Sequence, residues 1–194
     1  MNLYLFDFDG TISDKDSMIA FIFFIKKKHK LIISLVLSLP YIFKYLFGII
    51  AKSKFKESLL IQIFKEFTED ELRNASISFS TYFIKNSIKK SALESIQIAK
   101  NNKDQICIVT ASLDVWMIDI AEKLKLDLIC TESAFIDNTF AGFKSKNCIG
   151  KTKVDRVISK YSIDKYQDVL CFGDSKGDEE LLKLGTKNFY KYFS

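Results

Sequence analysis

Four aspartates of this chain follow short apolar runs and have the chemistry to form a site together. Asp7 and Asp9 come after the first apolar run, and Asp174 and Asp178 come after the last long one. Because Asp7 and Asp9 are two residues apart, both side chains can project from the same face of extended backbone. Four carboxylates that meet in one place repel each other unless a cation lies among them. Oxygen donors without histidine or thiolate favour Mg²⁺ over zinc or copper.

The alternative role of any single aspartate is structural, because aspartate often caps a helix or a turn. For Asp14 or Asp16 taken alone, capping is the more frequent role. The four-aspartate set differs, since its members come at predicted strand ends. Thr110 follows another such strand. We therefore interpret these residues as one site.

The elements that must position these residues alternate between strands and helices. Apolar runs predict strands at 3–6, 105–109, 127–130 and 168–172, with helices at 91–101, 113–124, 151–160 and 179–184. A hairpin over 134–143 is expected to turn at Asp137-Asn138. Strands that are apolar throughout predict an α/β fold, a Rossmann-like parallel sheet with helices on both faces. In such sheets the ligand lies outside the carboxyl ends of the strands, where the aspartates and Thr110 are expected.

Residues 14–90 show no strand pattern and predict an inserted α-helical cap. The catalytic core would then consist of residues 1–13 and 91–194. A 194-residue chain with 48% hydrophobic and 27% charged residues can fold around one such core.

Four motifs carry a resemblance to the haloacid dehalogenase superfamily, in family order. They are Asp7-Phe8-Asp9-Gly10-Thr11, Val109-Thr110, Lys151 at the start of a helix, and Gly173-Asp174-Ser175-Lys176-Gly177-Asp178. The helical insert after the first motif, Ser112 and the run 147–151 resemble the phosphoserine-phosphatase branch, subfamily IB. The resemblance covers the core, and the paired first and last motifs make it specific.

The resemblance implies a role for each matching residue. Asp7 would be the nucleophile that forms an aspartyl phosphate, and Asp9 the general acid and base. Thr110 would bind the transferring phosphoryl group, and Lys151 would neutralise its charge. Mg²⁺ would be held by Asp7, the backbone carbonyl of Asp9, and Asp174, with Asp178 nearby or acting through water. The substrate would contact Gly10, Thr11, Ala111 and Ser112. Asp16 matches an acidic substrate contact and could equally cap the first helix of the insert.

Residues 18–56 of the insert are unusually apolar and are interrupted by a basic block at 26–30. A single membrane crossing would separate Asp7 from Asp174, so we exclude a simple span. Two interpretations stay open. The cap helices could pack on each other or on a second subunit, or they could lie in the membrane interface with lysines on anionic headgroups. The order of apolar and basic runs is similar to that of bacterial phosphatidylglycerophosphatase C, which would imply a lipid-borne phosphate.

Composition excludes several other classes of protein. One histidine, His29, provides almost no material for a zinc site or a histidine-based triad. The four cysteines form no Cys-x-x-Cys pair, and from the residues at the start of the sequence we expect no export signal. We expect a cytoplasmic protein, at the inner face of the membrane if the interfacial interpretation holds. The net charge of +5 is mild, and no nucleic-acid recognition motif accompanies it.

The function predicted from the sequence is Mg²⁺-dependent hydrolysis of a phosphomonoester carried by a small molecule or a lipid. Two alternatives remain beside a lipid substrate. One is a soluble phosphatase acting on a small molecule such as phosphoserine, and the other is a catalytically silent module that binds phosphate.

Overall fold

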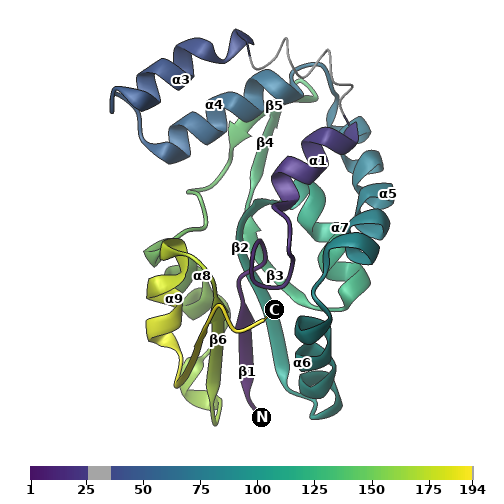
Figure 1. The fold of residues 1–194 in the computed structure, drawn as a ribbon, viewed down its shortest axis with the longest axis vertical. Coiled ribbons are helices and arrows are strands. Elements are labelled where there is room, and N and C mark those ends of the chain that lie inside the picture. Colours follow the sequence, from purple (N-terminus) through teal and green to yellow (C-terminus); the bar gives the residue numbers. More distant parts are fainter. Residues whose placement is uncertain (26–35, 194) are drawn as a thin grey trace.

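A five-stranded parallel sheet forms the centre of the molecule (Figure 1). The computed structural model describes residues 1–25 and 36–193. The strands are β1 (Leu3–Phe6), β2 (Gln105–Leu113), β3 (Asp127–Thr131), β6 (Val169–Gly173) and β7 (Lys187–Tyr190), and their order is β3-β2-β1-β6-β7. All neighbouring strands are parallel. The predicted Rossmann-like α/β fold is confirmed.

Helices cover both faces of the sheet because successive residues of a buried strand point to opposite sides. Leu3 and Leu5 pack with Val157 and Leu181 on one face, whereas Phe6 packs in the larger cluster on the other. The first face carries α8 (Lys151–Lys160) and α9 (Glu179–Leu184), and the second carries α6 (Lys90–Asn101) and α7 (Asp114–Leu124). The short 3₁₀ turns η1 (Ile163–Lys165) and η2 (Lys176–Asp178) flank β6.

The insert between β1 and β2 is helical, as its sequence indicates. Its described helices are α1 (Ser17–Ile25), α3 (Leu39–Leu46), α4 (Lys52–Phe64) and α5 (Glu69–Ser87). Thr68 and Glu71 form a capping box that begins α5. Phe21, Phe64 and Phe79 pack in the same cluster as Trp116 of α7, so the insert and the sheet share one apolar core. The division into a cap at 14–90 and a core therefore stays a prediction about organisation.

The predicted hairpin forms from β4 (Ser133–Ile136) and β5 (Thr139–Phe143), with both turn residues, Asp137 and Asn138, at positive φ. By sequence position the hairpin belongs to the predicted core, and in space it lies against the insert (Figure 1). The Phe143 N–H donates to Glu57 Oε1 at 2.9 Å, and Glu69 N–H donates to the Asn138 carbonyl at 3.1 Å. The hairpin therefore supports α4 and the start of α5.

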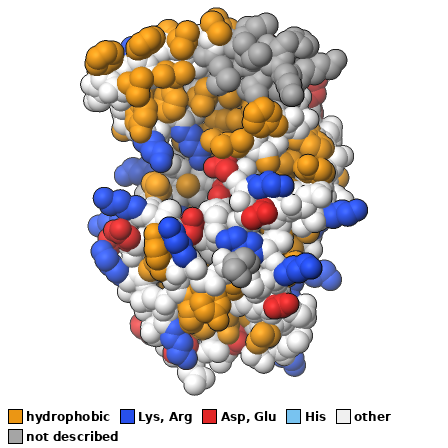
Figure 2. Space-filling view, viewed as in Figure 1, with side chains coloured by type: hydrophobic (Ala, Val, Ile, Leu, Met, Phe, Trp, Pro, Cys, Tyr) orange, Lys and Arg blue, Asp and Glu red, His pale blue; other side chains and the backbone are white. Residues whose placement is uncertain are grey.

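Helix α3 presents apolar side chains to solvent. None of its residues is buried, and the exposed side chains in and beside it are Val36, Leu37, Leu39, Phe43, Tyr45, Leu46, Phe47 and Ile49. Apolar side chains gather at this end of the molecule in Figure 2. Among residues 1–25 and 36–193, no helix combines the length and the apolar character that crossing a membrane requires. The basic block at 26–30 lies outside the described residues.

Candidate active site

The carboxyl ends of β1, β2 and β6 meet at one cavity of about 520 Å³. Asp7 follows β1 directly, and its N–H donates to the Phe172 carbonyl of β6 at 2.9 Å. The cavity is lined by residues from the sheet and from the insert, namely Asp7, Asp9, Asp16, Met18, Ala51, Lys52, Ser53, Lys56, Thr110, Ala111, Ser112, Asn147, Ile149, Lys153, Ser175, Gly177 and Asp178. The strand topology thus brings together residues that are more than 160 positions apart in the sequence.

Lys153 is the lysine of this cavity that contacts the aspartates. Its Nζ lies 2.5 Å from Asp7 Oδ1 and 2.7 Å from Asp178 Oδ1, and its side chain is buried. Lys151, to which the motif resemblance gives this role, is exposed and does not line the cavity. The prediction for Lys151 is therefore wrong by two residues. The physical reason is that α8 begins at Lys151, so that residue faces outward and the third residue of the helix faces the sheet.

Asp178 is held by several donors and is almost fully buried. Its Oδ1 accepts from Lys153, and its Oδ2 accepts from the Ser175 hydroxyl at 2.7 Å and the Ser175 N–H at 3.0 Å. Ser175 accepts in turn from the Gly177 N–H, which completes a capping box over η2. Because both Asp178 oxygens already have partners, Asp178 orients Lys153 as well as contributing negative charge.

Gly10 makes room for Asp174. Its φ is +86°, a region that residues with a side chain seldom adopt. A Cβ at this position would lie 2.3 Å from Asp174 Oδ2. The Thr11 hydroxyl lies 3.4 Å from Asp7 Oδ2 and 3.5 Å from Asp174 Oδ1, so it spans the two carboxylates. The Asp-Gly-Thr sequence is therefore needed for the geometry of the acidic cluster.

Asp7, Asp174 and Asp178 offer oxygens within 4.8 Å of one another. A set made only of carboxylate oxygens suits a hard divalent cation. The Asp9 carboxylate is not part of this set. The Asp9 backbone carbonyl as a metal ligand stays a prediction.

The electrostatics of the cluster also favour a cation. Burial raises the pKa of Asp7 to about 7, and the Asp178 and Asp9 charges raise it too, although Lys153 acts in the opposite direction. Burial and the Asp178 charge raise the pKa of Asp174. Burial also disfavours ionised Asp178, but Lys153 and the Ser175 donors outweigh it and lower its pKa. Lys153 is thus shared by the Asp7 and Asp178 carboxylates. A further positive charge beside the cluster would favour the ionised form of its carboxylates.

Asp9 is fixed by two short hydrogen bonds. Its Oδ1 accepts from the Ser17 N–H and its Oδ2 from the Ser112 hydroxyl, both at 2.6 Å. Burial and the Asp16 charge raise the pKa of Asp9, whereas Ser112 and Ser17 lower it. We expected Ser112 to contact substrate, and it lines the cavity. Its hydroxyl, however, donates its hydrogen bond to Asp9.

Thr110, Ala111 and Asp16 occupy different parts of the cavity wall. Thr110 is buried near the end of β2, and its Oγ1 accepts from the Ser112 N–H at 3.1 Å. Asp16 Oδ1 accepts from the Ile19 N–H at 2.9 Å, so Asp16 caps α1 while still lining the cavity. Of the two roles left open for Asp16, the capping role is therefore present in the structure, and the substrate contact stays a prediction.

The insert contributes positive charge that the sequence comparison did not identify. Lys56 of α4 donates to the Ala111 carbonyl at 3.1 Å, and Lys52, one turn earlier, also lines the cavity. Burial lowers the pKa of Lys56, while Asp9 and Asp16 act in the opposite direction. These lysines resemble the other surface lysines in sequence, so only the position of α4 over the sheet distinguishes them.

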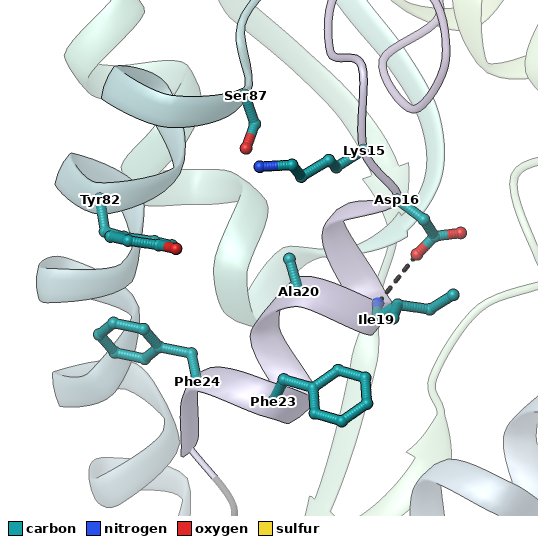
Figure 3. A pocket seen from close by; sticks show the side chains of 8 residues that line it. All are labelled: Lys15, Asp16, Ile19, Ala20, Phe23, Phe24, Tyr82 and Ser87. Atoms are coloured by element: carbon teal, nitrogen blue, oxygen red, sulfur yellow. Dashed lines mark hydrogen bonds between the residues drawn. The ribbon is translucent and has the colours of Figure 1, made fainter.

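A second cavity of about 650 Å³ lies on the other side of Asp16 (Figure 3). Phe23 and Phe24 of α1 and Tyr82 of α5 contribute aromatic side chains to its wall, with Lys15 at one edge. Although it is the larger of the two, it lacks the aspartate cluster. The chemistry therefore belongs to the first cavity, and the second offers an apolar surface beside it.

Comparisons with known proteins show the family of this chain and proteins that share its fold. The sequence model of the family described as haloacid dehalogenase-like hydrolase matches residues 4–183. Protein CicA of Caulobacter vibrioides (strain NA1000 / CB15N) is 26% identical over 197 residues, which cover 98% of this chain and 86% of that protein.

Solved structures share the fold at low sequence identity. A Bordetella pertussis Tohama I protein of unknown function aligns with a TM-score of 0.76 and 18% identity, covering 96% of this chain and 88% of that one. A substrate-bound phosphoserine phosphatase aligns with a TM-score of 0.67 and 17% identity, covering 97% and 84%. The chain belongs to the haloacid dehalogenase-like hydrolases.

Proposed function

We propose that this protein is a Mg²⁺-dependent phosphomonoesterase that works through an aspartyl phosphate on Asp7. The observation that carries the proposal is the buried contact of Lys153 with Asp7 beside the carboxylates of Asp174 and Asp178. A nucleophilic carboxylate needs a nearby positive charge to approach a phosphate dianion, and this arrangement supplies one.

Each residue of the site then has a defined task. Asp7 attacks phosphorus, and the bond to the ester oxygen breaks as the Asp7–phosphorus bond forms. Asp9 gives a proton to the departing oxygen and later takes one from the water that cleaves the aspartyl phosphate. Lys153 compensates the negative charge that Asp7 and the phosphoryl group share. Thr110, at the cavity wall, donates to a phosphoryl oxygen.

Asp7 and Asp174 would hold the Mg²⁺, with Asp178 behind them. When bound, the ion supplies charge stabilisation to the phosphoryl oxygens and keeps Asp7 ionised. The all-oxygen donor set and the room left by Gly10 support this assignment.

Release of 4-nitrophenol from 4-nitrophenyl phosphate tests the reaction class. We expect turnover that requires Mg²⁺ and stops in excess chelator. Binding of phosphate without any hydrolysis would favour the silent binding module instead.

We further propose that the substrate phosphate is carried by a lipid and that α3 lies on an anionic membrane surface. Residues 17–56 contain eight Lys and no Asp or Glu. The described part of this segment exposes Leu46 and Phe47 by 70% and 76%. Exposed apolar side chains flanked by lysines suit insertion between acyl chains beneath negative headgroups. The aromatic cavity shares Asp16 with the acidic cavity and offers an apolar surface to the rest of such a substrate.

A soluble substrate with a second anionic group is the alternative, and Lys56 in the cavity favours it. Phosphoserine is one such substrate, and a structural neighbour is a phosphoserine phosphatase. Comparison of kcat/KM for phosphoserine, sugar phosphates and lipid phosphates in mixed micelles separates the two. Higher kcat/KM for lipid phosphates supports the membrane proposal, and a clear preference for phosphoserine contradicts it.

A further inference from the structure

Both oxygens of Asp9 are engaged before any substrate is present. Oδ1 accepts from the backbone N–H of Ser17, and Oδ2 accepts from the Ser112 hydroxyl, each at 2.6 Å. Two bonds to different oxygens fix the rotation of the carboxyl plane as well as its position. Asp9 nevertheless lines the cavity, so its remaining lone pairs stay available to the reaction.

Behind Asp9 the hydrogen bonds continue through three buried side chains. Ser17 Oγ lies 3.1 Å from Ser112 Oγ, and the Trp116 Nε1–H donates to Ser17 Oγ at 3.0 Å. Trp116 and Ser17 have no exposed surface, and Ser112 is 2% exposed. Buried hydroxyls of this kind depend on one another for their hydrogen bonds.

The direction of this chain follows from the chemistry of its ends. An indole nitrogen can only donate, and the Asp9 oxygen that faces Ser112 must accept, because the proton of Asp9 is the one that goes to the leaving oxygen. Because the Ser112 hydroxyl donates its hydrogen to Asp9, its oxygen must accept from the Ser17 hydroxyl. The Ser17 oxygen accepts in turn from the Trp116 N–H. The Met117 sulfur, 3.9 Å from Ser17 Oγ, is a weaker competing acceptor. All donors therefore point from Trp116 toward Asp9.

The chain also joins parts of the molecule that are far apart in sequence. Ser17 begins α1 of the insert, Ser112 belongs to β2, and Trp116 belongs to α7. The Phe21 ring of α1 stacks on Trp116 with centroids 5.2 Å apart. Seating of α1 on α7 is thus a condition for the bonds that orient Asp9.

We propose that Trp116 and Ser17 are positioning residues that aim Asp9 at the leaving oxygen through Ser112. The inference rests on the proposed phosphatase function, in which Asp9 donates the leaving-group proton. General acid–base assistance is worth about 10²- to 10⁴-fold, and the need for it grows as the leaving group becomes more basic. Loss of orientation should therefore harm poor leaving groups more than good ones.

The test compares two aryl phosphates of similar size, 4-nitrophenyl phosphate with a good leaving group and 4-methoxyphenyl phosphate with a poor one. Trp116→Phe keeps the ring stacking and removes the N–H. Ser17→Ala removes the hydroxyl and keeps the backbone N–H, while Ser17→Thr restores a hydroxyl. Ser76→Ala is the control, because Ser76 is a buried serine of α5 whose hydroxyl has no partner among the described residues.

We expect Trp116→Phe and Ser17→Ala to lower kcat/KM, which reports the step in which the leaving group departs, about ten-fold more for 4-methoxyphenyl phosphate than for 4-nitrophenyl phosphate, within the range that acid–base assistance spans. Ser17→Thr should recover most of the difference, and Ser76→Ala should show none. An equal loss on both substrates, or no loss, would overturn the inference even though the phosphatase activity stands. If Trp116→Phe fails to fold, the two Ser17 variants decide the question alone. If the unaltered protein hydrolyses neither ester, the proposed function itself fails and this inference falls with it.

Discussion

Lys153 Nζ lies 2.5 Å from Asp7 Oδ1, and the two side chains are 2% and 10% exposed. Water and salt screen so enclosed a pair far less than a surface ion pair. Asp178 accepts from the same ammonium at 2.7 Å and is equally enclosed. A single lysine therefore balances two carboxylates at the centre of the site, and several consequences of that balance are measurable.

Replacing Lys153 by Met should abolish activity and weaken the fold. Removal of one partner from a buried ion pair costs about 3–5 kcal/mol because the other charge is left uncompensated. We expect kcat to fall at least about 100-fold, as for loss of other groups that stabilise a transition-state charge. Urea unfolding and phosphate release measure the two effects. Lys151→Met is the matched control, since Lys151 is exposed two residues away. Equal losses in both variants would contradict the assignment.

Asp7→Asn should eliminate phosphate release and leave the protein folded. The amide is nearly isosteric with the carboxyl group but cannot form an acyl phosphate. Incubation with ³²P-labelled substrate followed by acid quenching should label the unaltered protein and not this variant. Residual turnover near the original rate would remove Asp7 from the role of nucleophile.

Mg²⁺ should stabilise the protein more at pH 8 than at pH 5.5. Burial raises the pKa of Asp7 to about 7, above its ordinary value near 3.8, so the metal-free fold takes up a proton and loses stability as the pH rises through that interval. Mg²⁺ binds the ionised form and must displace that proton at low pH. Asp178, whose pKa is lowered, is ionised throughout. Thermal unfolding with Mg²⁺ or chelator measures the difference, and an identical increase in Tm at both pH values would argue against the metal site.

Gly10→Ala should weaken Mg²⁺ binding. The new Cβ would lie 2.3 Å from Asp174 Oδ2, so Asp174 must move, and the φ of +86° adds backbone strain of about 1–2 kcal/mol. We expect a higher Mg²⁺ concentration for half-maximal activity. Gly48→Ala is the control, because Gly48 also has positive φ but a Cβ there meets no atom within 4 Å. A normal Mg²⁺ dependence for Gly10→Ala would show that Asp174 is not a ligand.

Leu46→Glu and Phe47→Glu should reduce flotation of the protein with anionic vesicles. Each change replaces an exposed apolar side chain with a charge that both the acyl layer and the headgroups disfavour. Ile98→Glu, on α6 at the other end of the molecule, is the control, since Ile98 is 59% exposed. If Leu46→Glu and Phe47→Glu float as well as Ile98→Glu, the membrane proposal fails. It also fails if the unaltered protein does not float, and the soluble-substrate alternative then remains.

The sheet and the acidic cluster could be predicted because their signals are local. Strands β1, β3 and β6 contain short apolar runs, and Asp7 and Asp174 follow β1 and β6 directly, with Asp9 two residues after Asp7. The turn of the hairpin was visible in Asp137-Asn138. Its contact with α4 was not, since the bond from Phe143 to Glu57 joins residues 86 positions apart.

Lys153 could have been found from helix periodicity. Lys153 and Val157 lie four apart on one side of α8, Tyr161 follows at the same spacing just after its end, and all three are buried. Val157 and Tyr161 are apolar, which indicates that this side of the helix faces the sheet. A lysine on the same side is then expected to pair with a buried acid. Ser17 and Lys56 carried no comparable signal, because their roles depend on how the insert is placed over the strands.

Trp116 is the single tryptophan of the chain. Its ring stacks on Phe21 of α1 and meets the Phe64 ring of α4 edge-on, with centroids 6.4 Å apart. All indole emission from the protein therefore originates where the inserted helices rest on the sheet domain. Intrinsic fluorescence gives an unlabelled optical readout of that junction, in which shifts of wavelength or quenching during turnover report how α1 and α4 are seated.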